Sequence, residues 1–177
     1  MKRITDLKVE KLRTSYRKDS LGNRQQIRTP YIAARKVRVV EGGRRFGHFF
    51  IDMIIYSLLM IPVEVVFNIL VDYQPSTVGA AIFMSYFPSY IFYALYYFSF
   101  EYFTQSTPGK LLTKCIVINE FGQKPTINEL TVRSLVRLVP FEALSCLNER
   151  GWHDRWSNTW VVQKEENEKL QAILQEA

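Results

Sequence analysis

Ionisable side chains open the first long apolar stretch of this 177-residue chain, RFGHFFIDMIIYSLLMIPVEVVFNILV. Arg45 and Asp52 are seven residues apart there, and His48 lies one helical turn before Asp52. An Asp at the centre of a membrane helix costs about 2.5 to 3.5 kcal/mol on insertion scales, so it needs a partner, a water-filled cavity or a functional role. Two kinds of chemistry fit: ion pairs that hold helices together, and the carriage of a proton or a cation.

Asp52 needs a partner outside its own helix. Arg45 is about 10 Å away along a helix axis at 1.5 Å per residue, which is too far for an easy pair. Arg133 and Arg137 are four residues apart, on one face of a later amphipathic segment. We expect Asp52 to meet one of these two arginines.

Arg45 is expected to pair with Asp154 or Glu101, because all of these residues fall near the cytoplasmic face of the membrane in the topology derived below. The sequence therefore predicts a charged cluster near the cytoplasmic side of the bilayer. Its members are Arg45, Asp52, Glu101, Arg133, Arg137 and Asp154.

A second hypothesis assigns an ion or proton site to Asp52, His48 and Glu64. His48 can couple to the titration of Asp52, because histidine changes charge near neutral pH; the alternative is an interfacial histidine that is bonded locally. Glu64 stands four residues before Asn68 in the outer half of the same stretch. Burial there would favour its protonated form, and the alternatives are a subunit contact or a place near the outer headgroups.

Two nearly uncharged runs, 46–71 and 77–103, must position these residues. Each exceeds the roughly 20 residues that cross about 30 Å of hydrocarbon. The connector at 72–76 has no Lys or Arg, whereas basic residues flank the other ends of both runs. The positive-inside rule then places both termini in the cytoplasm. The expected fold is a mainly α, multi-pass membrane protein built on a two-span helical hairpin.

The segment 1–43 is expected to be a basic cytoplasmic arm, since residues 1–48 hold 14 of the 23 Lys and Arg and only four acidic residues. Most of it lacks helix or strand periodicity, although RKVRVVEGG at 35–43 could form a short strand. A solvated tail that enforces orientation and attraction to anionic lipid both fit. A nucleic-acid arm is disfavoured, because membrane topology explains the charge. The arm shows no signal-peptide core, so the first span is expected to be an uncleaved anchor.

A small polar unit follows the second run. The tetrapeptide TPGK at 107–110 is expected to stop the helix. Residues 112–119 are expected to form a strand that pairs with a second strand at 159–163, giving a small β-hairpin-like element. The last segment, 164–177, is expected to be a polar tail, either a solvated helix or frayed.

An amphipathic helix is expected between the two strands, over about residues 127–147. Thr126 and Glu129 match a capping box that would open it, and Pro140 would bend it. Charged residues make it a poor membrane span, so a place at the inner surface is expected. A third crossing or a re-entrant segment is the alternative.

Tyr86, Tyr90, Tyr93 and Tyr97 recur at steps of four, three and four, and Glu101 continues the same helix face. A tyrosine hydroxyl in hydrocarbon needs a partner, so this face is expected to contact protein. It can serve as a polar track leading to Glu101 or as a packing seam, and the seam is favoured.

Enzymatic and metal-dependent roles are not expected. The two histidines and the separated Cys115 and Cys146 lack metal-ligand or redox spacing, and both cysteines are expected to be free thiols. Ser157 follows His153-Asp154 without the elbow or oxyanion scaffold of a catalytic triad. The prediction is a non-enzyme with no cofactor and no metal.

The ordered landmarks resemble the RDD family of bacterial membrane proteins over roughly residues 44–163. The matching positions are Arg45 and Asp52 in R-x-x-x-x-x-I-D, Glu101 before TPGK, V-I-N-x-x-G-x-x-P at 117–125, Arg133 with Arg137, HDR at 153–155 and TWVV at 159–162. The resemblance implies a location in the bacterial cytoplasmic (inner) membrane. The family is named for one arginine and two aspartates, and the resemblance implies that these are Arg45, Asp52 and Asp154.

The chain departs from the family pattern in two places. His48 stands where alanine is common, and the segment between Arg137 and His153 is short where many members have a third span. The family has no settled activity, and exchange of sodium or potassium for protons has been proposed for some members.

Two functions follow from these expectations. The first is an interaction or assembly subunit of a membrane complex, as a homo-oligomer or with another membrane protein, in which the intramembrane charges specify packing. The alternative is cation/proton exchange through an oligomer, with Asp52, Glu64 and Glu101 as carriers. The first is preferred, because the two spans lack the broken-helix repeats of a transporter core.

Overall fold

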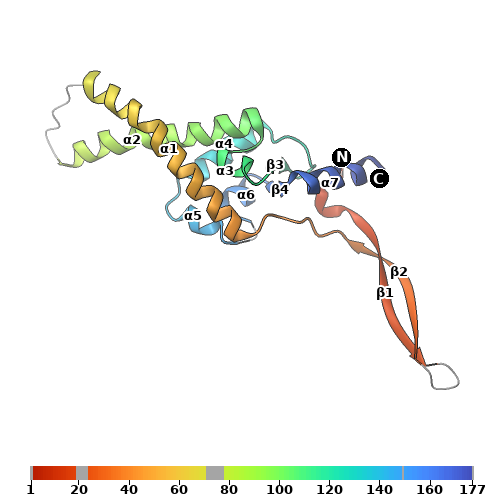
Figure 1. Cartoon of the computed structure of the whole chain (residues 1–177). Coiled ribbons are helices and arrows are strands. Elements are labelled where there is room, and N and C mark those ends of the chain that lie inside the picture. Colours follow the sequence, from red (N-terminus) through yellow and green to blue (C-terminus); the bar gives the residue numbers. More distant parts are fainter. Residues whose placement is uncertain (1, 19–23, 71–77, 149, 177) are drawn as a thin grey trace.

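Two long helices dominate one end of the molecule (Figure 1). The computed structural model describes residues 2–18, 24–70, 78–148 and 150–176, and for residues 67, 68, 70, 78–86 and 176 it describes only the backbone. Helix α1 spans Gly42–Leu70 and α2 spans Val78–Thr104, close to the two expected runs.

Within the described residues, one helix is long and apolar enough to cross a membrane, Gly42–Val66 of α1. Only 11% of its most apolar 18-residue window is buried inside the molecule, so this helix is unlike the enclosed core helix of a soluble protein. Tyr86 and Asn68 lie outside the residues with described side chains. The side chains of residues 78–86, which supply much of the apolar surface of α2, are likewise not described. The two-span hairpin therefore stays a prediction.

A polar body follows the helices. The strands β3 and β4 pair antiparallel, from Cys115 opposite Gln163 to Asn119 opposite Thr159, which confirms the expected pairing. The helices and strands of the polar body are α3 (Pro108–Leu111), β3 (Cys115–Asn119), α4 (Ile127–Val136), α5 (Glu142–Ser145), α6 (Trp152–Trp156), β4 (Thr159–Gln163) and α7 (Lys164–Glu176).

The TPGK segment does more than stop α2, which is all that the sequence predicts for it. Thr107 is the N-cap of a further helix, α3, and Pro108 is its first residue. Proline suits this position because its missing N–H would have no partner in the first helical turn. The short helix α3 delays the strand, which begins at Cys115 rather than at 112.

The expected amphipathic helix is two helices, α4 and α5. Its capping box is confirmed: the Glu129 amide donates to Thr126 Oγ1 at 3.3 Å, and the Thr126 amide donates to Glu129 Oε2 at 2.6 Å. The chain breaks near Pro140, and Phe141 takes a left-handed conformation at φ 66°. Helix α4 has 10 residues and α5 has four, so neither reaches the roughly 20 residues of a membrane crossing.

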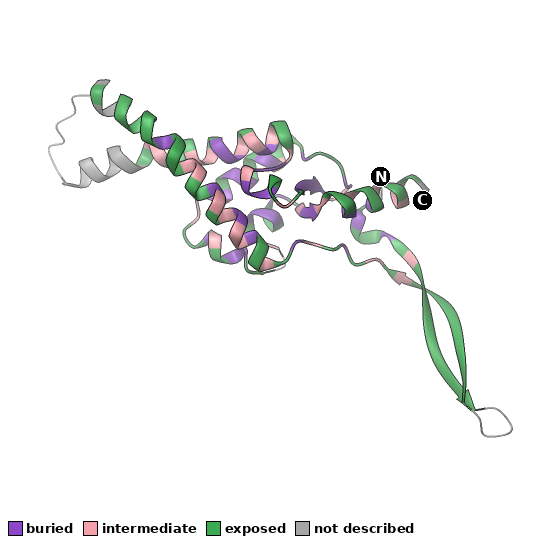
Figure 2. Ribbon diagram, viewed as in Figure 1, coloured by how far each residue is buried: buried purple, intermediate pink, exposed green. Residues whose placement is uncertain are grey.

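The N-terminal arm contains a structure that the sequence analysis missed. Strands β1 (Lys8–Lys18) and β2 (Arg24–Ala34) pair antiparallel over 11 residues each and project from the body (Figure 1). Both faces of this pair are almost wholly exposed (Figure 2), so the apolar and polar alternation that marks a half-buried strand is absent. The strand expected at 35–43 is reduced to one bridge between Val39 and Val162.

The base of the arm and the C-terminal helix cover the β3–β4 pair. Ile4 and Leu7 from the arm and Leu170 from α7 are buried in one core with Ile118 and Val162. Of the two alternatives for the C-terminal segment, the structure has the helix, and Leu170 on its apolar face closes this core. Burying each such aliphatic side chain contributes about 1.5 to 3 kcal/mol.

Candidate functional site: a buried cluster of charges

Eight charged side chains are buried where α1 and α2 meet the polar body. Four are cationic and four are acidic, so their formal charges cancel when all are ionised. They are Arg45, Lys110, Arg133 and Arg137, with Asp52, Glu101, Glu142 and Asp154.

Arg133 of α4 is the centre of this cluster and is fully buried. Its Nε donates to Glu101 Oε2 at 2.7 Å, and its Nη1 contacts both Asp154 Oδ1 and Thr159 Oγ1. One guanidinium therefore joins α2, α6 and β4. The planar fork of arginine suits such a junction, because its donors point in fixed directions.

Glu101, near the end of α2, receives two further cations. Lys110 Nζ donates to its Oε1 at 2.6 Å, and Arg137 Nη2 lies 3.3 Å from the same oxygen. The Arg137 guanidinium also stacks on the Tyr97 ring, 4.0 Å from its centroid. These contacts join α2 to α3 and to the C-cap residue of α4.

Arg45, in the first turns of α1, donates from Nη1 to Asp154 Oδ2 at 2.5 Å, which is one of the two pairings expected for it. Asp154 is fully buried and contacts two guanidiniums. Burial alone would raise the pKa of Asp154, but Arg133 and Arg45 hold it well below its usual range. The ion pair joins the start of α1 to α6.

Asp52 is also buried, at 1% exposure, but its partners differ from those expected. Thr107 Oγ1 donates to Asp52 Oδ2 at 2.6 Å, and the Gly109 amide donates to Oδ1 at 2.7 Å. Among the described residues no ion pair joins it to Arg133 or Arg137. A Cβ at Gly109 would lie 2.5 Å from the His48 carbonyl oxygen, so glycine allows α3 to approach α1 closely.

The RDD family model matches residues 39–158, about two thirds of the chain. The chain belongs to the RDD family. Its family trio of Arg45, Asp52 and Asp154 has the geometry given above: Arg45 and Asp154 form an ion pair, and Asp52 holds the TPGK turn. No curated protein and no solved structure matches the chain. The family assignment and the exposed apolar helix together indicate a membrane-associated protein.

His48 and Glu64 occupy different surroundings in the RDD domain. His48 is buried, and its Nε2 lies 2.6 Å from Thr113 Oγ1, which is the local bonding given as its alternative. Glu64 is exposed on α1, about 18 Å along the axis from Asp52 at 1.5 Å per residue. The structure does not bring Glu64 to the cluster.

The tyrosine face of α2 is partly a packing seam. Tyr97 is buried, and its ring lies 5.0 Å from that of Tyr93, which in turn contacts Tyr56 of α1 at 5.2 Å. Tyr56 donates to the Ser89 carbonyl at 2.6 Å. Tyr90 is 55% exposed, so the described part of this face is buried only towards the Glu101 end of α2.

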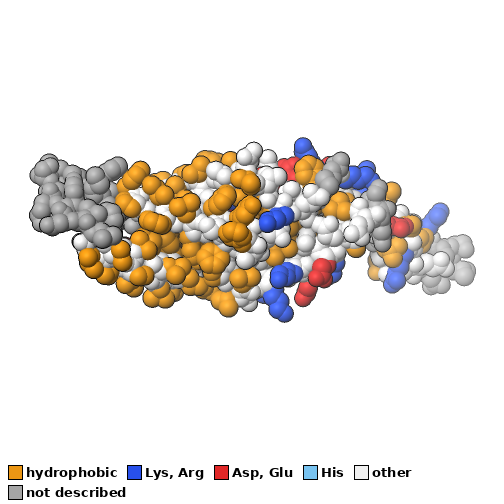
Figure 3. Space-filling model, turned by 90° about the horizontal axis from the view of Figure 1, so that it is seen from above, with side chains coloured by type: hydrophobic (Ala, Val, Ile, Leu, Met, Phe, Trp, Pro, Cys, Tyr) orange, Lys and Arg blue, Asp and Glu red, His pale blue; other side chains and the backbone are white. Residues whose placement is uncertain are grey.

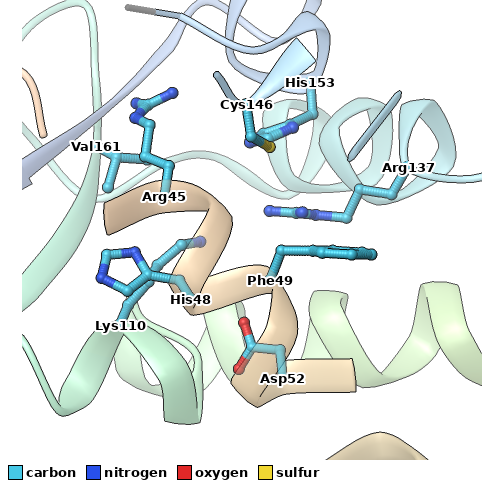
Figure 4. A pocket seen from close by; sticks show the side chains of 9 residues that line it. All are labelled: Arg45, His48, Phe49, Asp52, Lys110, Arg137, Cys146, His153 and Val161. Atoms are coloured by element: carbon cyan, nitrogen blue, oxygen red, sulfur yellow. The ribbon is translucent and has the colours of Figure 1, made fainter. Parts of the chain in front are cut away.

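A small cavity of about 20 Å³ lies beside the cluster (Figure 4). That volume is enough for about one water molecule. Arg45, His48 and Arg137 line it, and each has a buried side-chain nitrogen without a hydrogen-bond partner among the described residues. The cavity is too small for a continuous aqueous path through one chain.

Sequence reasoning missed four members of the site: Thr107, Lys110, Glu142 and His153. The first two belong to TPGK, in which each residue has its own role. Thr107 caps α3, Pro108 starts it, Gly109 permits the close approach to α1, and Lys110 is a counter-ion of Glu101. A tetrapeptide that combines a helix-capping threonine, a proline, a glycine and a lysine was the signal in the sequence that could have indicated Thr107 and Lys110.

No local spacing links Glu142 to His153, although His153 begins the HDR landmark at 153–155. His153 Nδ1 contacts Glu142 Oε1, and both side chains are buried. Burial and the Arg137 charge lower the pKa of His153 to about 4. Burial would raise the pKa of Glu142, but hydrogen bonding to His153 outweighs it and lowers the pKa to about 2.

Proposed function

We propose that this RDD-family protein is an interaction or assembly subunit of a membrane complex, and that the β1–β2 hairpin is its docking arm. The hairpin carries the proposal. It is a separate two-stranded sheet that projects from the body, and it has seven Lys and Arg against one Glu in its two strands (Figure 1).

The hairpin has the properties of an unfilled interface. Leu12, Tyr16 and Ile32 lie on one of its faces and are 63, 71 and 74% exposed. Among the described residues each strand pairs only with the other, so the outer edges are open to an added strand from another protein. An isolated two-stranded hairpin is marginal in water, so a partner that covers it would also stabilise it.

The proposed partner is a protein with an acidic surface. In the proposed topology α1 and α2 both span the inner membrane, and the termini lie in the cytoplasm. Apolar side chains gather over the end formed by these helices, and charged ones over the other end (Figure 3). The hairpin runs away from the helical end (Figure 1), which favours a cytoplasmic protein over the anionic lipid suggested by the charge of the arm.

The buried cluster supports this role differently from the way the sequence suggested. From the sequence, the intramembrane charges are expected to specify packing with another chain, but their contacts join elements of the same chain. We infer that they fix the long helices to the polar body and so give the docking arm a rigid base. Packing with another copy would then use the exposed apolar faces of α1 and α2.

Cation/proton exchange is the second candidate, and one observation favours it. Asp52 is a buried carboxylate with no ion pair among the described residues, and it borders the small cavity. Such a group can bind a proton or cation without first breaking a salt bridge. This role requires an oligomer to supply the walls of a pathway.

One preparation tests both candidates. The full chain is purified in mild detergent, its co-purifying proteins are identified, and it is reconstituted for pH-driven sodium and potassium flux with Asp52→Asn as the control. The proposal predicts a stoichiometric protein partner and no flux. Flux that is abolished in Asp52→Asn would overturn it in favour of exchange.

A further inference from the structure

Three metal-ligating side chains of different types meet beside the charged cluster: Glu142 at the start of α5, Cys146 directly after it and His153 on α6. All three are buried, and their ligand atoms lie within 4.8 Å of one another. Carboxylate oxygen, thiolate sulfur and imidazole nitrogen are the three protein ligand types of zinc. Cys146 and His153 also line the small cavity (Figure 4).

The imidazole of His153 is flanked by two carboxylates. Its Nδ1 contacts Glu142 Oε1, and its Nε2 lies 3.3 Å from Asp154 Oδ1. A neutral imidazole has one N–H, so it can donate to only one of them and turns a lone pair towards the other. Only a doubly protonated ring, or a cation bound at one ring nitrogen, satisfies both carboxylates.

A cation at Nδ1 removes this conflict. Nε2–H is then free to donate to Asp154, which gives the carboxylate–histidine–metal arrangement that commonly orients metal-bound histidines. Glu142 Oε1 contacts Nδ1, and Cys146 Sγ offers a third ligand atom in the same group, whose ligand atoms lie within 4.8 Å of one another. Ionised Cys146 and Glu142 supply two negatively charged ligands for a divalent ion, and Glu142 already belongs to the balanced cluster.

We propose that Glu142, Cys146 and His153 bind a divalent metal ion of the zinc class through Oε, Sγ and Nδ1, with a water in the adjoining cavity as fourth ligand. The ion replaces the contact between Nδ1 and Glu142, and Cys146 loses its proton on binding. A water ligand fits the cavity volume of about 20 Å³. The site would fasten α5 to α6 within the body, independently of what the hairpin binds.

The test uses the full chain, purified in mild detergent without a polyhistidine tag and loaded with Co(II) or Zn(II) alone. The expected result is one metal per chain and a thiolate-to-cobalt absorption band. The band is lost in Cys146→Ser and kept in Cys115→Ser, which removes the other buried cysteine. No metal binding by the wild type, or an unchanged band in Cys146→Ser, would overturn the proposal.

A second measurement avoids the concern that Cys146→Ser fails to fold. In Cys115→Ser, Cys146 is the only cysteine left, so its reaction with a thiol reagent reports on this site alone. Zn(II) is expected to protect the thiol, and a chelator is expected to restore its reactivity. Equal reactivity with zinc and with chelator would contradict metal binding.

Discussion

The buried cluster and the projecting hairpin use the same residue types in opposite ways. In the cluster, arginine and lysine are desolvated and contact acidic side chains from other elements of the chain. The two strands of the hairpin contain seven basic residues and one glutamate, and both strands are exposed. The cluster is balanced in itself, whereas the hairpin leaves its charge available to a partner.

This difference separates stability from recognition. Removing one member of a buried pair leaves an uncompensated charge in a low-dielectric environment, which is costly. Removing an exposed charge changes little in the fold but alters long-range attraction and partner choice. Substitutions of matched type in the two regions should therefore affect different measurements.

The largest effect is expected for Arg133→Met. It removes the guanidinium that contacts both Glu101 and Asp154, and breaking such a buried pair costs about 3 to 5 kcal/mol. Thermal unfolding in detergent measures the loss. Arg13→Met in the exposed strand β1 is the matched control and should unfold at the wild-type temperature. Equal unfolding temperatures for the two variants would refute the division between the regions.

The Arg45–Asp154 pair, at 2.5 Å, should show direct energetic coupling. A double-mutant cycle with Arg45→Met and Asp154→Asn is expected to give about 1 to 3 kcal/mol, within the range for contacting residues. Arg45→Met combined with Arg13→Met is the control cycle and should be additive. A coupling near zero in the first cycle would mean that α1 is not held to α6 through this pair.

Asp52→Ala should cost less than the loss of Arg133. It leaves the Thr107 hydroxyl and the Gly109 amide buried without their acceptor, a loss of about 1 to 3 kcal/mol. Asp52→Asn should cost less still, because its amide can bond both groups. Chemical denaturation of the two variants measures this order, and equal losses would show that the charge, which both variants remove, matters rather than hydrogen bonding.

The pH dependence of stability sharpens the account of Lys110. Burial lowers its pKa from the ordinary 10.5 to about 8, and the Glu101 carboxylate offsets only part of that effect. Between these values the unfolded state binds more protons than the folded state, so the stability of the wild type should rise with pH relative to Lys110→Met. The difference in slope is at most about 1.4 kcal/mol per pH unit. Parallel profiles would contradict a desolvated amine.

Much of the fold follows from local signals in the sequence. The long helices, the capping box at Thr126 and Glu129, and the β3–β4 pairing all depend on patterns within one or two elements. Such patterns record backbone hydrogen bonding and one-sided burial, which short stretches of sequence reveal. The first strand of this pair begins at Cys115 rather than at 112, because the TPGK segment that was expected only to stop α2 also starts the helix α3.

The site was harder to predict, because its contacts join distant residues. Charge and topology indicated Asp154 or Glu101 as the partner of Arg45. They could not distinguish a guanidinium from the Thr107 hydroxyl and the Gly109 amide as partners for Asp52. The hairpin was not predicted for a different reason. Its two faces are both exposed, so no alternation of apolar residues marks its strands.

Photocrosslinking from Tyr16 in intact membranes tests the central claim most directly, because this hairpin side chain is 71% exposed. The account predicts one protein adduct, lost when Arg13 and Arg17 are changed to Glu and kept when the exposed Lys164 and Lys169 of α7 are changed to Glu. A lipid adduct, or a protein adduct that survives the hairpin substitutions, would contradict the docking role of the hairpin.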